Sequence, residues 1–207
     1  MGFPNERSVE LSEFLSQYMQ QIQAGFQAID IVSLKKVVSV LDAAIKRGST
    51  IYTCGNGGSS SIAEHFVCDF FKGTSTGTDI QPLVHSLTSN IPTVMAVAND
   101  ICYEEVFSFQ LEKYGKSGDV LLCVSSSGSS PNIIRALSTA KAKNIESISF
   151  VGFTGGDAIA LSDTCINIPI TNYGVVEDVH HSLMHVLAQY IRLTNLDNDT
   201  NINNTVF

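Results

Sequence analysis

Two short segments, far apart in the chain, concentrate histidines and carboxylates. In the first, His65 and Asp69 are four residues apart, which places both side chains on one face of a helix. In the second, Glu177, His181 and His185 recur at the same interval of four. Such groups transfer protons or bind a divalent metal, although a structural hydrogen bond also explains an isolated pair. Because three of the five histidines fall at 180–185, we expect a ligand or catalytic role for this segment.

Two turns rich in glycine and hydroxyl groups have the composition of a phosphate site. Residues 55–61 read GNGGSSS, and residues 125–132 read SSSGSSPN. Glycines let the backbone approach an anion, and a helix that follows such a turn offers free N–H groups. An ordinary capped turn explains either segment alone, but two in one sheet indicate a common ligand. Neither turn carries a Walker lysine or the dinucleotide fingerprint.

The pattern of apolar runs predicts the elements that must position these groups. Short runs suited to strands alternate with longer runs of helical period, which indicates a parallel sheet with helices on both faces. Ligands of such sheets bind beyond the carboxyl ends of the strands, where both turns fall. His85, alone on a strand, is expected to be structural. The predicted strands are 50–54, 83–87, 119–124, 147–151 and 165–170, and the predicted helices of this region are 60–72, 91–98, 102–114, 131–143, 156–161 and 176–194.

Two amphipathic helices are predicted ahead of the first strand. Apolar residues recur with helical spacing over 8–28 and again over 34–45, with Asp30 or Ser33 as the N-cap of the second helix and Gly48 after its end. The wide apolar face of the first helix needs a partner, and we favour an oligomer interface over packing within the chain.

Composition bounds the class of protein. The 207 residues are 44% hydrophobic and 15% charged, which suits a single folded domain. The net charge of −8 and the lack of a basic cluster argue against nucleic-acid binding. Five irregularly spaced cysteines without a CxxC pair, and no apolar leader or membrane-length segment, lead us to expect a soluble cytoplasmic protein.

Together these motifs resemble the SIS (sugar isomerase) domain family over nearly the whole chain, to about Leu193. Its Cys-Gly-Asn-Gly-Gly-Ser loop matches residues 54–59, and its helical His-Phe matches 65–66. Its Gly/Ala-Asn-Asp turn matches 98–100, and its Gly-Asp-Val-Leu strand with the following Ser-x-Ser-Gly-x-Ser loop matches 118–130. The resemblance implies a three-layer, flavodoxin-like α/β sandwich with a central five-stranded parallel sheet. It implies one domain over 1–207, with helices for oligomer packing at 1–48, the α/β core at 49–195 and a flexible tail at 196–207.

The resemblance also implies a reaction and its residues. Within the family, the chain is similar to isomerases that convert sedoheptulose 7-phosphate to D-glycero-D-manno-heptose 7-phosphate through an enediol. Asp69 and His185 would be the catalytic pair, and zinc would be held by His65, Asp69, Glu177 and His185. The assembly would be a homotetramer with sites shared between subunits. The phosphosugar would be bound by Asn56, Gly57, Gly58, Ser59, Asn99, Asp100, Ser125, Ser126, Ser127, Ser130 and Glu177.

Two departures keep alternatives open. The family's Arg-Ile-Gln-Glu before the last helix is Val175-Val176-Glu177-Asp178 here, and its glutamate at position 69 is an aspartate, shorter by one methylene. A different phosphosugar substrate, or a non-enzymatic phosphosugar-binding regulator, is therefore the alternative. If Glu177 and His185 lie on one continuous helix, eight residues separate them by about 12 Å, and His181 is then the spare ligand.

Overall fold

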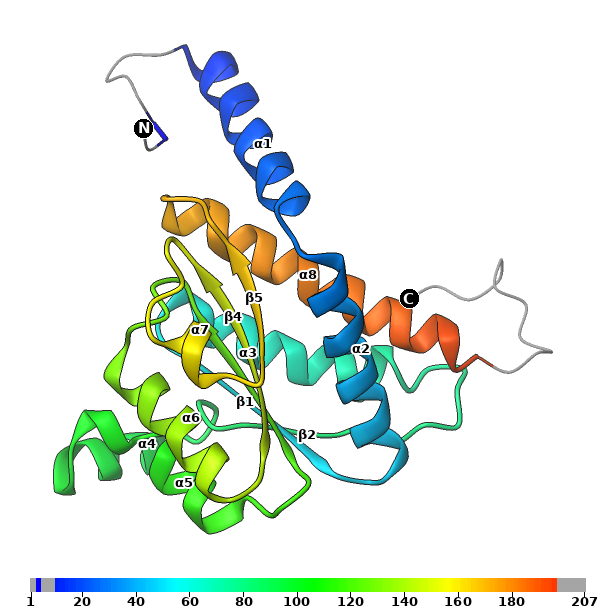
Figure 1. Cartoon of the computed structure of the whole chain (residues 1–207), viewed down its shortest axis with the longest axis vertical. Helices are drawn as coiled ribbons and strands as arrows, with labels where there is room; N and C mark the ends of the chain where they lie inside the picture. The colour runs from blue at the N-terminus through cyan, green and yellow to red at the C-terminus, as the bar shows by residue number, and fades with distance from the viewer. Residues whose placement is uncertain (1–2, 5–9, 197–207) are drawn as a thin grey trace.

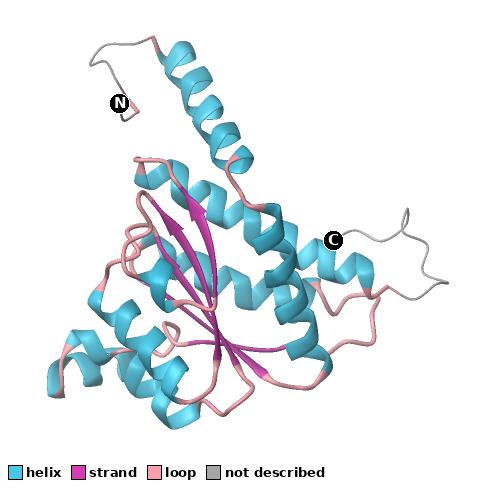
Figure 2. Ribbon diagram, in the orientation of Figure 1, coloured by secondary structure: helices cyan, strands magenta, loops and turns pink. Residues whose placement is uncertain are grey.

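A computed structural model describes residues 3–4 and 10–196 and contains one five-stranded parallel sheet (Figures 1 and 2). The strand order is β2-β1-β3-β4-β5, and every neighbouring pair is parallel. The strands are β1 (Thr50–Gly55), β2 (Leu83–Ser86), β3 (Val120–Ser125), β4 (Glu146–Gly152) and β5 (Thr164–Ile168). The three-layer fold class predicted from the sequence is confirmed.

Helices cover both faces of this sheet. One apolar cluster joins the sheet to α2 (Ile31–Lys46), α3 (Gly58–Cys68) and α8 (Tyr173–Thr194). A second cluster on the opposite face joins it to α4 (Ile91–Asp100), α5 (Ser108–Tyr114), α6 (Pro131–Ala142) and α7 (Ala158–Leu161). β3 is buried along its whole length because both clusters pack on it.

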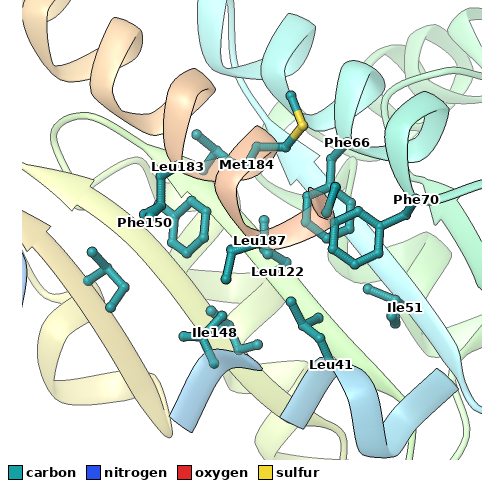
Figure 3. Packing of buried hydrophobic residues seen from close by; sticks show 14 of the residues in the cluster. Leu41, Ile51, Phe66, Phe70, Leu122, Ile148, Phe150, Leu183, Met184 and Leu187 are labelled. Carbon is teal, nitrogen blue, oxygen red and sulfur yellow. The ribbon is translucent and has the colours of Figure 1, made fainter. Parts of the chain in front are cut away.

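The core beneath α8 is built from large apolar side chains (Figure 3). Phe66 and Phe70 stack with their ring centroids 3.9 Å apart, and both are almost fully buried. Leu183, Met184 and Leu187 of α8 belong to the same cluster as β-strand residues such as Leu122. This packing fixes the position of α8 over the strands that carry the site.

The N-terminal helix α1 (Leu11–Gln27) projects beyond the sheet and packs against α8 (Figure 1). Tyr18 donates a hydrogen bond to Asp178 of α8 at 2.6 Å. On the outer face of α1, the side chains of Leu11, Leu15 and Met19 are exposed. The oligomer interface expected on this helix therefore stays a prediction.

Element boundaries differ from the sequence prediction in three informative places. The helix predicted over 60–72 ends at Cys68 and continues as a π-helical turn, Asp69–Gly73. The helix predicted over 102–114 is a 3₁₀ turn, Tyr103–Glu105, followed by α5. α8 begins at Tyr173, not 176, because the Asn172 side chain accepts from the Val175 N–H and caps it there.

The predicted cap of α2 is confirmed, since Asp30 accepts from the N–H groups of Val32 and Ser33. The flexible tail predicted for 196–207 lies outside the described residues except for Leu196, which bridges to Thr78. Across the described residues, no helix has both the length and the apolarity to traverse a bilayer.

Candidate active site

The two hydroxyl-rich turns lie side by side at the carboxyl edge of the sheet. They follow β1 and β3, which are neighbours whose register runs up to Gly55 opposite Val124. The helix after β1, α3, packs on one face of the sheet, whereas the helix after β3, α6, packs on the other. The chain therefore diverges at this edge, and such a divergence opens the crevice in which α/β proteins bind ligands.

A cavity of about 150 Å³ occupies this crevice. The Oγ of Ser126 is buried and has no hydrogen-bond partner among the described atoms. Ser130 is the N-cap residue of α6, yet its side chain makes no capping bond, and the N-cap of α3 is Gly57, which has none to offer. The N–H groups of Gly58 and Ser59 at the start of α3 and of Asn132 at the start of α6, together with several hydroxyls, are thus available to an anion; Pro131 has no N–H, and that of Ile133 is bonded to Asn132. The lining residues are Asn56, Ser59, Ser125, Ser126, Ser127, Ser130, Tyr173 and Glu177.

The second turn is clamped against a glycine turn that follows β4. Gly128 has φ +63°, and a Cβ placed on it would lie 2.0 Å from the carbonyl oxygen of Gly155. Gly128 also accepts from the N–H of Ala158 at 3.0 Å. Glycine at 128 thus permits both the left-handed backbone and the close approach that shape the serine turn.

A pair of asparagines links the two turns. Asn56 and Asn132 exchange two side-chain hydrogen bonds, each 2.9 Å long. The hydroxyl of Tyr103 donates a third bond, also 2.9 Å, to Oδ1 of Asn56. Asn132 is 1% exposed and Asn56 is partly buried, so this amide pair is a partly buried connection between the start of α3 and the start of α6.

Three histidines from α3 and α8 converge farther along these two helices, which also contribute Ser59 and Glu177 to the cavity lining. The ligand nitrogens of His65, His181 and His185 all lie within 4.8 Å of one another. Nε2 of His181 and Nδ1 of His65 are 2.9 Å apart, and Nδ1 of His185 donates to Oδ2 of Asp69 at 2.6 Å. His65 and His185 keep 41% and 38% of their side-chain surface exposed, so the cluster is open to a ligand.

The π-helical turn sets the position of Asp69. The N–H of Thr74 donates to the Asp69 carbonyl at 2.9 Å, five residues away, which widens the helix at this point. The carboxylate then meets both histidines of the sequence prediction, since its Oδ1 lies 3.3 Å from Nε2 of His65 and its Oδ2 binds His185. Wide turns of this kind are frequent at functional sites.

Glu177 lies in the serine cavity and is not part of the histidine cluster. A Cβ on Gly58 would lie 2.3 Å from Oε2 of Glu177, which places this carboxylate over the first turn. α8 runs unbroken from Tyr173 to Thr194, so Glu177 and His185 are separated by about 12 Å along one helix. Burial raises the pKa of Glu177, and the neighbouring Asp178 carboxylate raises it further.

His180, the third histidine of the segment, is a buried core residue. Its Nε2 donates to the carbonyl of Val151 at 3.1 Å, whereas its Nδ1 has no partner among the described atoms. Burial lowers the pKa of His180 to about 4, so the ring is neutral at physiological pH. It fastens α8 to β4 next to the serine turn.

The structure thus brings together most of the residues predicted from the sequence. Glu177 lines the cavity but is not among the three histidines of the candidate metal cluster. Asn99 and Asp100 do not line the serine cavity, because they are exposed in the last turn of α4 and bonded to each other at 2.8 Å. Tyr103 and Tyr173 were missed. The early cap of α8 at Asn172 was the signal that could have found Tyr173.

The fold and this site define the class of protein. The family model for the SIS domain matches residues 15–152, and the chain belongs to that family. The chain is 33% identical over 189 residues to a phosphoheptose isomerase of Colwellia psychrerythraea, which covers 89% of this chain and 96% of the relative. It is 35% identical over 188 residues to that of Cytophaga hutchinsonii, with 90% and 92% covered.

Solved structures of phosphoheptose isomerases have a similar fold. The phosphoheptose isomerase of Neisseria gonorrhoeae superposes with a TM-score of 0.79 at 26% identity, covering 87% of this chain and 97% of that one. The enzyme of Francisella tularensis gives a TM-score of 0.82 at 24% identity, covering 90% and 100%, and this likeness is one of fold.

Proposed function

We propose that this protein is an aldose–ketose isomerase that converts sedoheptulose 7-phosphate to D-glycero-D-manno-heptose 7-phosphate. The observation that carries the proposal is the hydrogen-bonded pair of Asp69 and His185, in a chain whose relatives are phosphoheptose isomerases. His185 lies about 12 Å along α8 from Glu177, which lines the hydroxyl-rich cavity. The pair supplies an acid and a base, and the cavity supplies a site for phosphate.

The phosphate anchors at the two turns. Ser125, Ser126, Ser127 and Ser130 offer hydroxyls, Ser59 adds one from the first turn, and the helix N-termini behind them offer backbone N–H groups. The buried Ser126 hydroxyl, which lacks a protein partner, supports this role because an unpaired buried hydroxyl is costly until a ligand accepts its proton. Anchoring the remote phosphate holds the reacting carbons in place for the proton transfers.

Asp69 and His185 carry out the proton transfers. One group removes a proton from the hydroxyl-bearing C1 next to the C2 ketone, which gives an enediol. A proton returned to C2 then leaves the aldehyde at C1, while the hydroxyl proton moves between the two oxygens. The 2.6 Å bond to Asp69 orients the His185 ring and leaves its Nε2 free.

A zinc ion fits the histidine cluster. Three imidazole nitrogens within 4.8 Å of one another form a donor set typical of zinc, and a bound ion would polarise the substrate carbonyl. His65 and His185 were expected as ligands. We propose His181 as the third, in place of Glu177, which lies in the serine cavity. Asp69 orients His185 and is the proton-transfer group that stays available when Nε2 of His185 holds the ion.

We also propose a cytoplasmic homotetramer with sites shared between subunits. The exposed apolar residues of α1 border a groove of about 750 Å³ that a second copy of the chain would cover. The cysteines, all of them free, suit a reducing compartment. Size-exclusion chromatography with light scattering tests the assembly.

An isomerisation assay tests the function. Sedoheptulose 7-phosphate should be converted, and Asp69→Asn and His185→Ala should each lower kcat by about 100-fold or more. His85→Ala is the matched control, because this histidine lies on β2 between the rings of Tyr52 and Tyr114. Full rates in both site variants would disprove the assignment, and a panel of other phosphosugars decides the substrate.

A further inference from the structure

We propose that Asn56, Asn132 and Tyr103 form an amide clasp, a set of positioning residues that holds the two phosphate-binding turns at a fixed separation. The inference rests on the proposed function in taking phosphate as the ligand of the turns. It assigns a role to Asn132 and Tyr103, and it changes the role of Asn56 from substrate ligand to positioning residue.

The backbone alone does not fix the separation of the turns. The ladder between β1 and β3 ends at Gly55 and Val124, and the chain then leaves toward opposite faces of the sheet. The described backbone hydrogen bonds of the second turn run within it or to Gly152 and Ala158. None of those described joins residues 56–60 to residues 125–132.

The asparagine pair supplies the missing connection with a defined geometry. The N–H of Ile133 donates to Oδ1 of Asn132 at 3.0 Å, which identifies that atom as the oxygen. Nδ2 of Asn132 must then face Oδ1 of Asn56, and Nδ2 of Asn56 must face Oδ1 of Asn132, as observed. Burial of Asn132 makes these bonds costly to break, since the freed groups would lack solvent.

Tyr103 is the third residue of the clasp. The Tyr103 hydroxyl gives Oδ1 of Asn56 a second donor, so the oxygen is saturated. The 3₁₀ turn that carries Tyr103 is itself tied to α6, because Glu105 forms an ion pair with Arg135. Tyr103 is therefore positioned by the same helix whose N-terminus faces the cavity.

The saturation of Asn56 has a consequence for binding. With its oxygen taken by two donors and one amide proton committed to Asn132, the side chain has one N–H left for a ligand. The serine hydroxyls and the helix N–H groups are then the phosphate ligands, and the clasp sets the distance between the two groups of donors. Loosening it should weaken phosphate binding without disturbing Asp69 or His185, which lie outside the clasp.

Calorimetry with inorganic phosphate and steady-state kinetics with sedoheptulose 7-phosphate test the clasp. Asn132→Ala should raise the Kd for phosphate and the KM by about tenfold, with kcat within about threefold of wild type. Asn132→Asp should match it, because the isosteric carboxylate loses the donor and repels Oδ1 of Asn56. Tyr103→Phe should raise the Kd for phosphate and the KM by about threefold. Because Tyr103 is exposed, this variant should fold as the wild type does.

Asp30→Ala is the control for a general loss of stability, since it removes the cap of α2 far along the chain and should leave Kd and KM unchanged. If Asn132→Asp and Tyr103→Phe bind phosphate within twofold of wild type, or lose kcat with KM intact, the clasp is refuted. A wild-type protein that binds phosphate but does not isomerise the sugar would overturn the proposed function alone. The clasp would still be tested by comparing the phosphate Kd of the variants with that of the wild type. A wild-type protein that binds neither phosphate nor the sugar phosphate would overturn the clasp.

Discussion

Replacing Gly128 by alanine should destabilise the protein in two separable ways. The residue has φ +63°, and forcing an alanine into this left-handed region costs about 1 kcal/mol. The added Cβ would also lie 2.0 Å from the Gly155 carbonyl oxygen, which is backbone and cannot swing away. Overpacking of this kind costs about 1–3 kcal/mol, so the expected total is about 2–4 kcal/mol.

Gly48→Ala isolates the backbone cost. Gly48 has φ +71°, and nothing lies within 4 Å of the Cβ position. This variant should lose only about 1 kcal/mol. The difference between the two variants then measures the contact between the serine turn and Gly155.

Urea denaturation of both variants measures the free energy of unfolding. If their m-values are equal, a shift in the midpoint reports a difference in stability. Gly128→Ala should also weaken inorganic phosphate binding, whereas Gly48→Ala should not. Equal stability losses in the two variants, together with unchanged phosphate affinity in both, would refute the view that the turn at 125–130 is held in shape by its contact with Gly155.

Three further predictions concern the helices around the site. His181→Ala should lower zinc affinity at least about tenfold in competition with a fluorescent chelator, while Glu177→Ala stays within about threefold; the reverse order would restore Glu177 as the ligand. In metal-free protein, the neutral buried His180 should cost about 2 kcal/mol of unfolding free energy on going from about pH 7.5 to pH 5, because the unfolded ring binds a proton below its normal pKa of 6.5 and the folded ring does so only near 4. Denaturation of His180→Gln should lose that part of the pH dependence, and retention of it would place the titration elsewhere. Asp30→Ala should cost about 1 kcal/mol, with Asp30→Asn close to wild type; thermal melts showing no difference would contradict the capping role.

The sequence predicted the strands and the sheet edge well because continuous apolar runs such as 120–124 suit only a buried strand, and the turns that follow them have an unusual composition. It was less informative about side chains that act across the fold. Asn132 looked like one more polar residue in a helix N-terminus, and Tyr103 lies in an exposed 3₁₀ turn whose proximity to Asn56 is purely tertiary.

The histidine segment shows the same limit. Spacing alone put Glu177, His181 and His185 on one stripe and could not say where along the stripe a ligand would bind. The structure places the Glu177 carboxylate over the first turn and in the serine cavity, whereas His181 and His185 lie farther along α8. The rise of one continuous helix thereby separates this carboxylate from His185 by about 12 Å.

Because α8 is continuous from Tyr173 to Thr194, it fixes the distance between residues at its two ends. Glu177 lines the serine cavity at one end of the stripe, and His185, which we propose for proton transfer, lies at the other, with about 12 Å of helix between them. Loop motion does not change helical rise, so under the proposed mechanism the number of residues between these positions sets the distance that a substrate must span.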